Sequence, residues 1–362
     1  MMVTRPLPEY VWPVPSQTTI KTSSCTVYHC NGCGLFQLQD FSDHEIASFY
    51  AYGSFVEENM KGKENRLEKI LNFLGPQFFK NKTVLDVGGG NNPFLKLLRG
   101  ATPDLFVSDF DISPETADLC PGKIFSGNFE EVAIPEKYFD TIVSFHFMEH
   151  MNKPSRVVQK MKSLMKPDSK LIVEVPNFSE VVHKMSYYSI YHQHINMFTR
   201  STLIGLMQGN GFQLDKVLSE DLTLLMVFRL SENLLTNEDP SSEEWVLEGL
   251  LKKMKFLEVA IADFLNSTNP QALAVYGAGG SSALLVHYFE SILARIRHCY
   301  DRDSFKQGKI LPGTGVCIEA PSKIGKSDAV IFLSDEILNT FKDQLTCPTL
   351  SIETLLKQAG GN

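Results

Sequence analysis

Apolar and polar positions follow two periods along the chain, one typical of strands and one of helices. Short apolar runs predict strands at residues 83–87, 104–111, 140–145 and 170–175, and amphipathic spacing predicts helices at 57–79 and 153–165. Because strands alternate with helices, we expect an α/β fold with a parallel sheet and right-handed crossovers. Two more strands, 212–218 and 222–230, are separated by three residues only, which predicts an antiparallel hairpin.

A polar stretch at residues 231–242 interrupts this pattern and contains a proline, as an exposed boundary should. A long helix at 243–266 follows, and then a second strand–turn–helix pattern begins with ALAVYGAGGSSALL at 272–285. We therefore predict a short cysteine-bearing module at 1–57, a central α/β domain at 58–235 and a smaller α/β domain at 243–362.

Composition narrows the classes of protein. The chain has 362 residues, 43% of them hydrophobic, and a net charge of −8, which indicates a globular protein and disfavours nucleic acid as a partner. Apolar runs are too short for a membrane span, and we expect no membrane partner. Seven cysteines, an odd number, predict reduced thiols and a cytoplasmic location.

A glycine-rich turn follows the strand at 83–87. Asp86 lies near the end of that strand, and Gly88, Gly89 and Gly90 follow where the chain reverses. Glycines in such a turn let backbone amides approach a ligand. A plain strand-to-helix turn has the same pattern, and nicotinamide enzymes, flavoproteins and methyltransferases all use one, so this motif alone leaves the ligand open.

The motifs that follow narrow the choice. An acidic residue ends the next strand (Asp109 or Asp111), and GNFEEV (127–132) and FDTIVSFHFMEHM (139–151) occupy the next strand ends. Together they resemble the class I S-adenosylmethionine-dependent methyltransferases, which implies an enzyme with a Rossmann-like seven-stranded core. By this resemblance Asp86, Gly88 and Gly90 line the methionine part of the cofactor, Asp111 holds the ribose, and Asn128 and Phe129 flank the adenine. Asn92 and Asn128 depart from the family pattern, which has glycine and an acid there. The pair Glu149–His150, an acid beside a histidine, either takes part in catalysis or, as is typical of this family, packs and hydrogen-bonds its loop.

The segment at 175–203 is rich in tyrosine and histidine, and its YHQH string resembles the YHEH segment of sugar C-methyltransferases. YHCNGCGLFQL (28–38) and DRDSFKQGKILPGTGVCIEAP (301–321) extend the resemblance over nearly the whole chain. It implies methylation of a carbon beside the keto group of a nucleotide-linked deoxysugar, with His194 as the base and Tyr191 and His192 as orienting or oxyanion-donor groups. Gln193 replaces the family's glutamate, which removes a negative charge beside His194.

The three clustered cysteines leave two alternatives. Cys30 and Cys33 make one C-x-x-C pair, and Cys25 stands alone upstream. A structural zinc needs four ligands. The module either holds zinc through Cys25, Cys30, Cys33 and a further side chain such as His44, or folds by packing alone.

Three other functions stay open. The turn in VYGAGGSS with Asp301 suggests a nicotinamide oxidoreductase, although the acid lies at a marginal distance. O- or N-methylation of another small molecule needs no base, unlike C-methylation. A non-catalytic cofactor-binding scaffold would explain Gln193 and the incomplete cysteine set.

Overall fold

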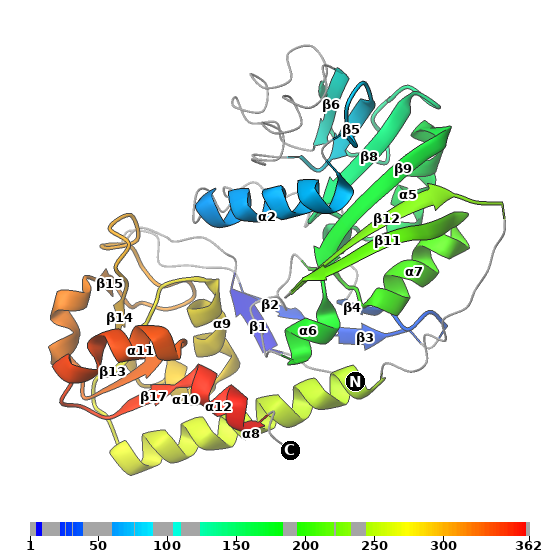
Figure 1. The fold of residues 1–362 in the computed structure, drawn as a ribbon. Helices are drawn as coiled ribbons and strands as arrows, with labels where there is room; N and C mark the ends of the chain where they lie inside the picture. Colours follow the sequence, from blue (N-terminus) through cyan, green and yellow to red (C-terminus); the bar gives the residue numbers. More distant parts are fainter. Residues whose placement is uncertain are drawn as a thin grey trace. The chain divides into compact units, whose positions relative to one another are not determined.

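The computed structural model describes residues 5–8, 22–25, 27–30, 32–38, 60–75, 77–89, 104–109, 124–183, 194–220, 222–232 and 244–359. The chain divides into two compact units, and each is described by itself (Figure 1). The core unit comprises His29–Phe178 and Gln193–Ser242. The C-terminal unit comprises Met1–Tyr28, Ser179–His192 and Glu243–Asn362.

The core unit is built on a seven-stranded sheet with the order β11-β12-β9-β8-β5-β6-β7. Its strands are β5 (Thr83–Val87), β6 (Asp104–Asp109), β7 (Ile124–Ser126), β8 (Phe139–Phe145), β9 (Met165–Pro176), β11 (Phe212–Glu220) and β12 (Thr223–Leu230). The first five are parallel, and β12 runs antiparallel to both β9 and β11. The structure thus confirms the predicted parallel sheet and the hairpin at its end.

Helices of the core unit begin and end where local chemistry dictates. They are α2 (Met60–Leu74), α5 (Pro154–Leu164), α7 (Arg200–Gly209) and the single turn η1 (Met148–His150), and α6 (Phe178–His183) begins at the unit boundary. Pro154 occupies the first turn of α5, where its missing N–H costs nothing. The prediction of a helix to residue 79 is wrong: α2 ends at Leu74, because Gly75 takes a φ of 100° that stops the helix.

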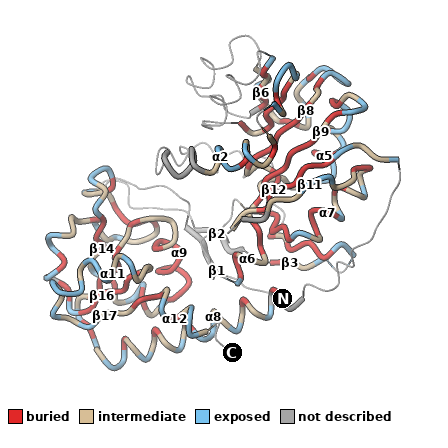
Figure 2. Tube along the Cα trace, in the orientation of Figure 1, coloured by how far each residue is buried: buried red, intermediate tan, exposed pale blue. Residues whose placement is uncertain are grey.

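Burial follows the sheet (Figure 2). β5 and β8 are buried nearly throughout, as expected for central parallel strands with both faces covered. Arg66 of α2 reaches the buried carboxylate of Glu174 on β9 at 2.5 Å, so an ion pair fixes this helix to the sheet. A small sheet with the order β10-β4-β3 adds β3 (Val27–His29), β4 (Phe36–Leu38) and β10 (Asn196–Met197).

The C-terminal unit has a five-stranded parallel sheet with the order β15-β14-β13-β16-β17. Its strands are β13 (Leu273–Tyr276), β14 (Ile296–Tyr300), β15 (Ile318–Glu319), β16 (Ala329–Phe332) and β17 (Thr349–Ser351). Its helical segments are α8 (Glu244–Thr268), α9 (Gly280–Tyr288), α10 (Glu290–Leu293), η4 (Pro321–Lys326), α11 (Asp335–Phe341), η5 (Lys342–Gln344) and α12 (Ile352–Ala359). In the same unit β1 (Arg5–Pro8) and β2 (Thr22–Cys25) pair antiparallel. The second α/β pattern seen in the sequence is therefore a second sheet.

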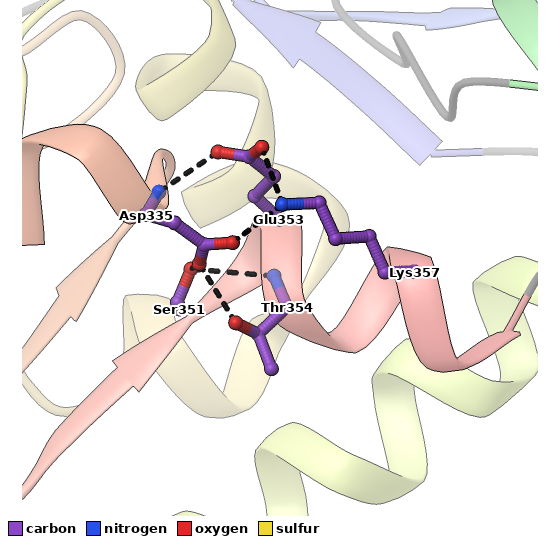
Figure 3. A network of polar contacts seen from close by, with 5 residues as sticks. All are labelled: Asp335, Ser351, Glu353, Thr354 and Lys357. Atoms are coloured by element: carbon purple, nitrogen blue, oxygen red, sulfur yellow. Dashed lines mark hydrogen bonds and ion pairs between the residues drawn. The ribbon is translucent and has the colours of Figure 1, made fainter.

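A polar network joins α11 to β17 and α12 (Figure 3). The Asp335 carboxylate accepts hydrogen bonds from the hydroxyls of Ser351 and Thr354, and from the Lys357 ammonium at 2.7 Å. These donors hold the pKa of Asp335 at about 2. None of the described helices combines the length and apolar character needed to cross a membrane.

Candidate active site

The glycine turn after β5 places two of the predicted cofactor residues together. Gly88 has a φ of 77° and donates its N–H to the carbonyl of Ser108 at 2.7 Å. A Cβ on Gly88 would lie 2.5 Å from Cδ2 of Phe147, and one on Gly89 would lie 3.0 Å from Oδ2 of the buried Asp86. Only glycine fits this turn, because both positions approach a neighbouring side chain so closely. Gly90 and Asp111 lie outside the described residues.

Phe147 connects this turn to the residues expected at the adenine. Its ring packs edge-on against Phe129, with centroids 6.0 Å apart. Asn128 uses its amide oxygen to accept the N–H of Glu130 at 3.0 Å, which closes a turn after β7. The ends of β5, β7 and β8 therefore meet at one edge of the sheet. Phe147 was not predicted from the sequence, although its position shortly after β8 puts it at this edge of the sheet.

Three histidines surround one buried carboxylate after β8. Glu149 is fully buried, and its Oε1 accepts a hydrogen bond from Nδ1 of His146 at 3.0 Å. Nε2 of His150 lies 3.9 Å from the same oxygen. His194 joins them from the segment before β10, with its ring centroid 5.2 Å from that of His150. One ligand atom from each of Glu149, His150 and His194 lies within 4.8 Å of the others.

The electrostatics of this cluster favour an ionised carboxylate. Burial alone would raise the pKa of Glu149, but the hydrogen bond from His146 and the electrostatic interactions with His150, His146 and His194 lower it to about 2. A buried carboxylate needs such partners, because an unpaired charge in a protein interior is very costly. Glu149 thus has the expected loop hydrogen bond, to His146. No spacing in the sequence indicates that His194 lies beside it.

Asn196 holds the two chain segments of the cluster together. Its amide nitrogen donates to the carbonyls of Met148 and Met151, at 3.0 and 2.6 Å, and its oxygen accepts from Gln37 at 2.7 Å. The side chain is buried. This clamp fixes His194, two residues earlier, against η1. Among the other residues predicted in the YHQH string, Tyr191, His192 and Gln193 lie outside the described residues.

The cysteine pair forms a tight turn in the core unit. The carbonyl of Cys30 accepts a hydrogen bond from the N–H of Gly34 at 2.8 Å, and Gly34 has a φ of 70°. Backbone N–H groups of Cys33 and Gly32 lower the pKa of the Cys30 thiol. Both thiols are free and exposed. The turn suits two ligands of a metal site, whereas the side chains of Cys25 and His44 lie outside the description.

The second glycine turn engages its own acid. Asp301, after β14, accepts the N–H of Ala278 at 2.7 Å and that of Asp303 at 2.8 Å, and lies 3.6 Å from the ammonium of Lys306. A dinucleotide-binding turn uses the acid at this place for a ribose. Because the protein's own donors occupy both oxygens of Asp301, the geometry disfavours the nicotinamide alternative.

Comparisons with known proteins match two families along the chain. Residues 56–217 match the model of a methyltransferase domain, and residues 249–346 match that of a C-methyltransferase C-terminal domain. A curated relative, the C-methyltransferase NovU of Streptomyces niveus, is 22% identical over 323 residues, which cover 81% of this chain and 76% of the relative.

Solved structures of methyltransferases are also similar. One is the 1,6-didemethyltoxoflavin-N1-methyltransferase of Burkholderia thailandensis, solved with S-adenosylhomocysteine bound. It is 17% identical to this chain, and the alignment covers 62% of this chain and 100% of that structure with a TM-score of 0.42. Another is an S-adenosylmethionine-dependent methyltransferase of Mesorhizobium loti, which is 11% identical to this chain. The alignment covers 46% of this chain and 100% of that structure with a TM-score of 0.39.

Proposed function

Because the chain is an S-adenosylmethionine-dependent methyltransferase with a C-methyltransferase C-terminal domain, we propose that it methylates a carbon next to the keto group of a nucleotide-linked deoxysugar. The observation that carries this proposal is the position of His194 beside Glu149 and His150, in the loop that follows β8. O- or N-methylation would need no such base.

The residues of the turn fit S-adenosylmethionine. Gly88 and Gly89 let the chain turn tightly against Phe147 and the carboxylate of Asp86, where a Cβ would not fit. An acid beside a glycine turn suits the amino group of the methionine part. When bound, the cofactor supplies an electrophilic methyl group, and the net products are the C-methylated ketone, S-adenosylhomocysteine and one proton.

His194 supplies the base in this proposal. Its neutral imidazole takes the proton from the carbon next to the keto group, and the C–H electron pair becomes the double bond of an enolate, whose charge rests on oxygen. An imidazole is a weak base for such a proton, so donors must stabilise that oxygen. Tyr191 and His192 are the proposed donors. The imidazolium then releases its proton to solvent.

A panel of keto-sugar nucleotides tests the substrate class. The protein is incubated with methyl-labelled cofactor and each candidate, and mass spectrometry locates the label. We expect label on a carbon adjacent to the ketone of at least one nucleotide-linked sugar. Label on oxygen or nitrogen, or label only on acceptors that carry no nucleotide, would reject the proposal.

We also propose a structural zinc held by Cys30, Cys33 and Cys25, since the turn of 30–34 presents two thiols with a lowered pKa at Cys30. Metal analysis of the purified protein should give one zinc per chain, and Cys30→Ser should remove it. Cys347→Ser, which changes a free thiol of the C-terminal unit, is the control. Zinc-free wild-type protein of normal stability would favour a module that folds by packing alone. A cytoplasmic location is also part of the proposal, and the free thiols of the described cysteines are in keeping with it.

A further inference from the structure

The carboxylate of Glu149 has more neighbours than its loop needs. Its hydrogen bond to His146 uses Oε1 and secures the turn after β8, where His146 has a φ of 51°. Oε2 is buried and accepts no hydrogen bond from any residue that the structure describes. The rings of His150 and His194 lie close to this carboxylate, from two different segments of the chain.

Distance and burial decide how strongly these groups act on each other. A carboxylate within about 4–6 Å of an imidazole stabilises the protonated ring, and the effect grows where water is excluded. Glu149 is fully buried. The ionisable groups that act on it are His146 and His150 from its own loop after β8, and His194 from the segment before β10. The carboxylate is therefore placed to stabilise a positive charge on His194.

We propose that Glu149 is a positioning residue for His194: its buried carboxylate orients the imidazole, together with His150, and stabilises the imidazolium that forms when His194 takes the substrate proton. The inference rests on the proposed function for the role of His194. Glu149 neither gains nor loses a proton in this step. It supplies the negative charge that Gln193 does not carry.

The clamp of Asn196 explains why this pairing is built into the fold. By donating to the carbonyls of Met148 and Met151, it holds the residues before and after Glu149 and His150. His194 comes two residues before Asn196 in the chain. A shift of either segment would separate the carboxylate from the ring, and the two hydrogen bonds of Asn196 oppose it.

Glu149→Gln tests the proposal, because it keeps the shape and removes the charge. The rate constant kcat/KM should rise with pH as the base loses its proton. Without the carboxylate the protonated ring is less stable, so the midpoint of this rise should move to lower pH by about one to two units. The weaker base should lower the plateau about tenfold. Glu149→Asp, which retains the charge, should keep a midpoint close to that of the wild type.

Two further measurements keep the test decisive. NMR of histidine labelled with carbon-13, with the His194 signal identified by its loss in His194→Asn, should show the same shift in the pKa of His194 without any substrate. Asp140→Asn is the matched control, since this carboxylate of the same unit binds Thr83 and Lys166 away from the histidines, and it should leave the midpoint unchanged.

The outcomes separate the two proposals. If the wild type methylates no keto sugar, the proposed function fails, while the NMR titration still decides whether Glu149 acts on His194. An unchanged His194 titration in folded Glu149→Gln protein, judged by S-adenosylhomocysteine binding, overturns the inference. Zn²⁺ bound by the Cys30→Ser protein and lost in the Cys30→Ser, Glu149→Gln double variant would also overturn it, because the cluster would then be a metal site.

Discussion

The turns after β5 and β13 have the same backbone geometry in two different units. Gly88 and Gly277 have φ values of 77° and 98°, and each donates its N–H to a carbonyl at the end of the next strand, that of Ser108 or Tyr300, at 2.7 Å. Their surroundings differ. A Cβ on Gly88 would press on Phe147, whereas one on Gly277 would meet only Ser282 Oγ at 3.5 Å.

The neighbouring strand ends differ in the same way. β8 lies beside β5 and is followed by the cluster of Glu149, His150 and His194, whose loop is held by Asn196. β16 lies beside β13 and is followed by Asp335, whose carboxylate binds Ser351, Thr354 and Lys357 (Figure 3). In our proposal the polar residues after β8 serve chemistry, whereas those after β16 hold helices together, so a glycine turn alone does not identify a ligand site.

The largest effect expected from this comparison is at the glycines. Gly88→Ala should cost about 2–4 kcal/mol, because it combines a left-handed residue with a clash against Phe147, and calorimetry should show S-adenosylhomocysteine affinity reduced more than tenfold. Gly277→Ala should cost only about 1 kcal/mol. Equal loss of cofactor affinity in both variants would contradict the assignment of the ligand to the first turn.

The next largest effect is expected when the Asn196 clamp is removed. Asn196→Ala removes the donor to the carbonyls of Met148 and Met151 and should destabilise the core unit by about 2–3 kcal/mol. Methyl transfer should fall about tenfold to a hundredfold, because His194 loses its place. Unfolding by urea and single-turnover rates measure the two effects. Full activity in this variant would show that η1 and the segment before β10 need no clamp.

Asp301→Asn should have a smaller effect, confined to stability. It weakens the pairing with Lys306 and replaces an acceptor of two backbone N–H groups, which should cost about 1–3 kcal/mol. Cofactor affinity, measured by calorimetry, should not change, because the acid belongs to the other unit. A tenfold loss of affinity would mean that the second turn takes part in cofactor binding.

Asp335→Asn should have the smallest effect, and it should depend on pH. The pKa of Asp335 falls from 3.8 to about 2 in the folded chain, so its contribution is complete above pH 3.8 and is lost as the pH falls toward 2. The variant should be about 1 kcal/mol less stable near pH 6, since the side chain is partly exposed, and the difference should vanish near pH 2. A constant difference in unfolding midpoint across this range would contradict the ionised network.

The sequence predicted the sheets well and the site only in part. Apolar runs such as TVLDV place β5 as Thr83–Val87, because central parallel strands are buried on both faces. The end of α2 was missed, since helical spacing continues past Gly75 although its φ of 100° ends the helix. The meeting of Glu149 and His194 could not be read from spacing, because it depends on the packing of β10 onto η1. The role of Asn196 depends on the same contact.

The most direct test of the central claim is exchange of the acceptor's α-hydrogen with solvent. The keto-sugar nucleotide is incubated in D₂O with S-adenosylhomocysteine and either the wild type or His194→Asn, and NMR follows deuterium at that carbon. Wild-type protein should exchange one position, and the variant should do so at least about a hundredfold more slowly while its S-adenosylhomocysteine affinity is retained. Exchange and methyl transfer at the wild-type rate in His194→Asn would contradict the account.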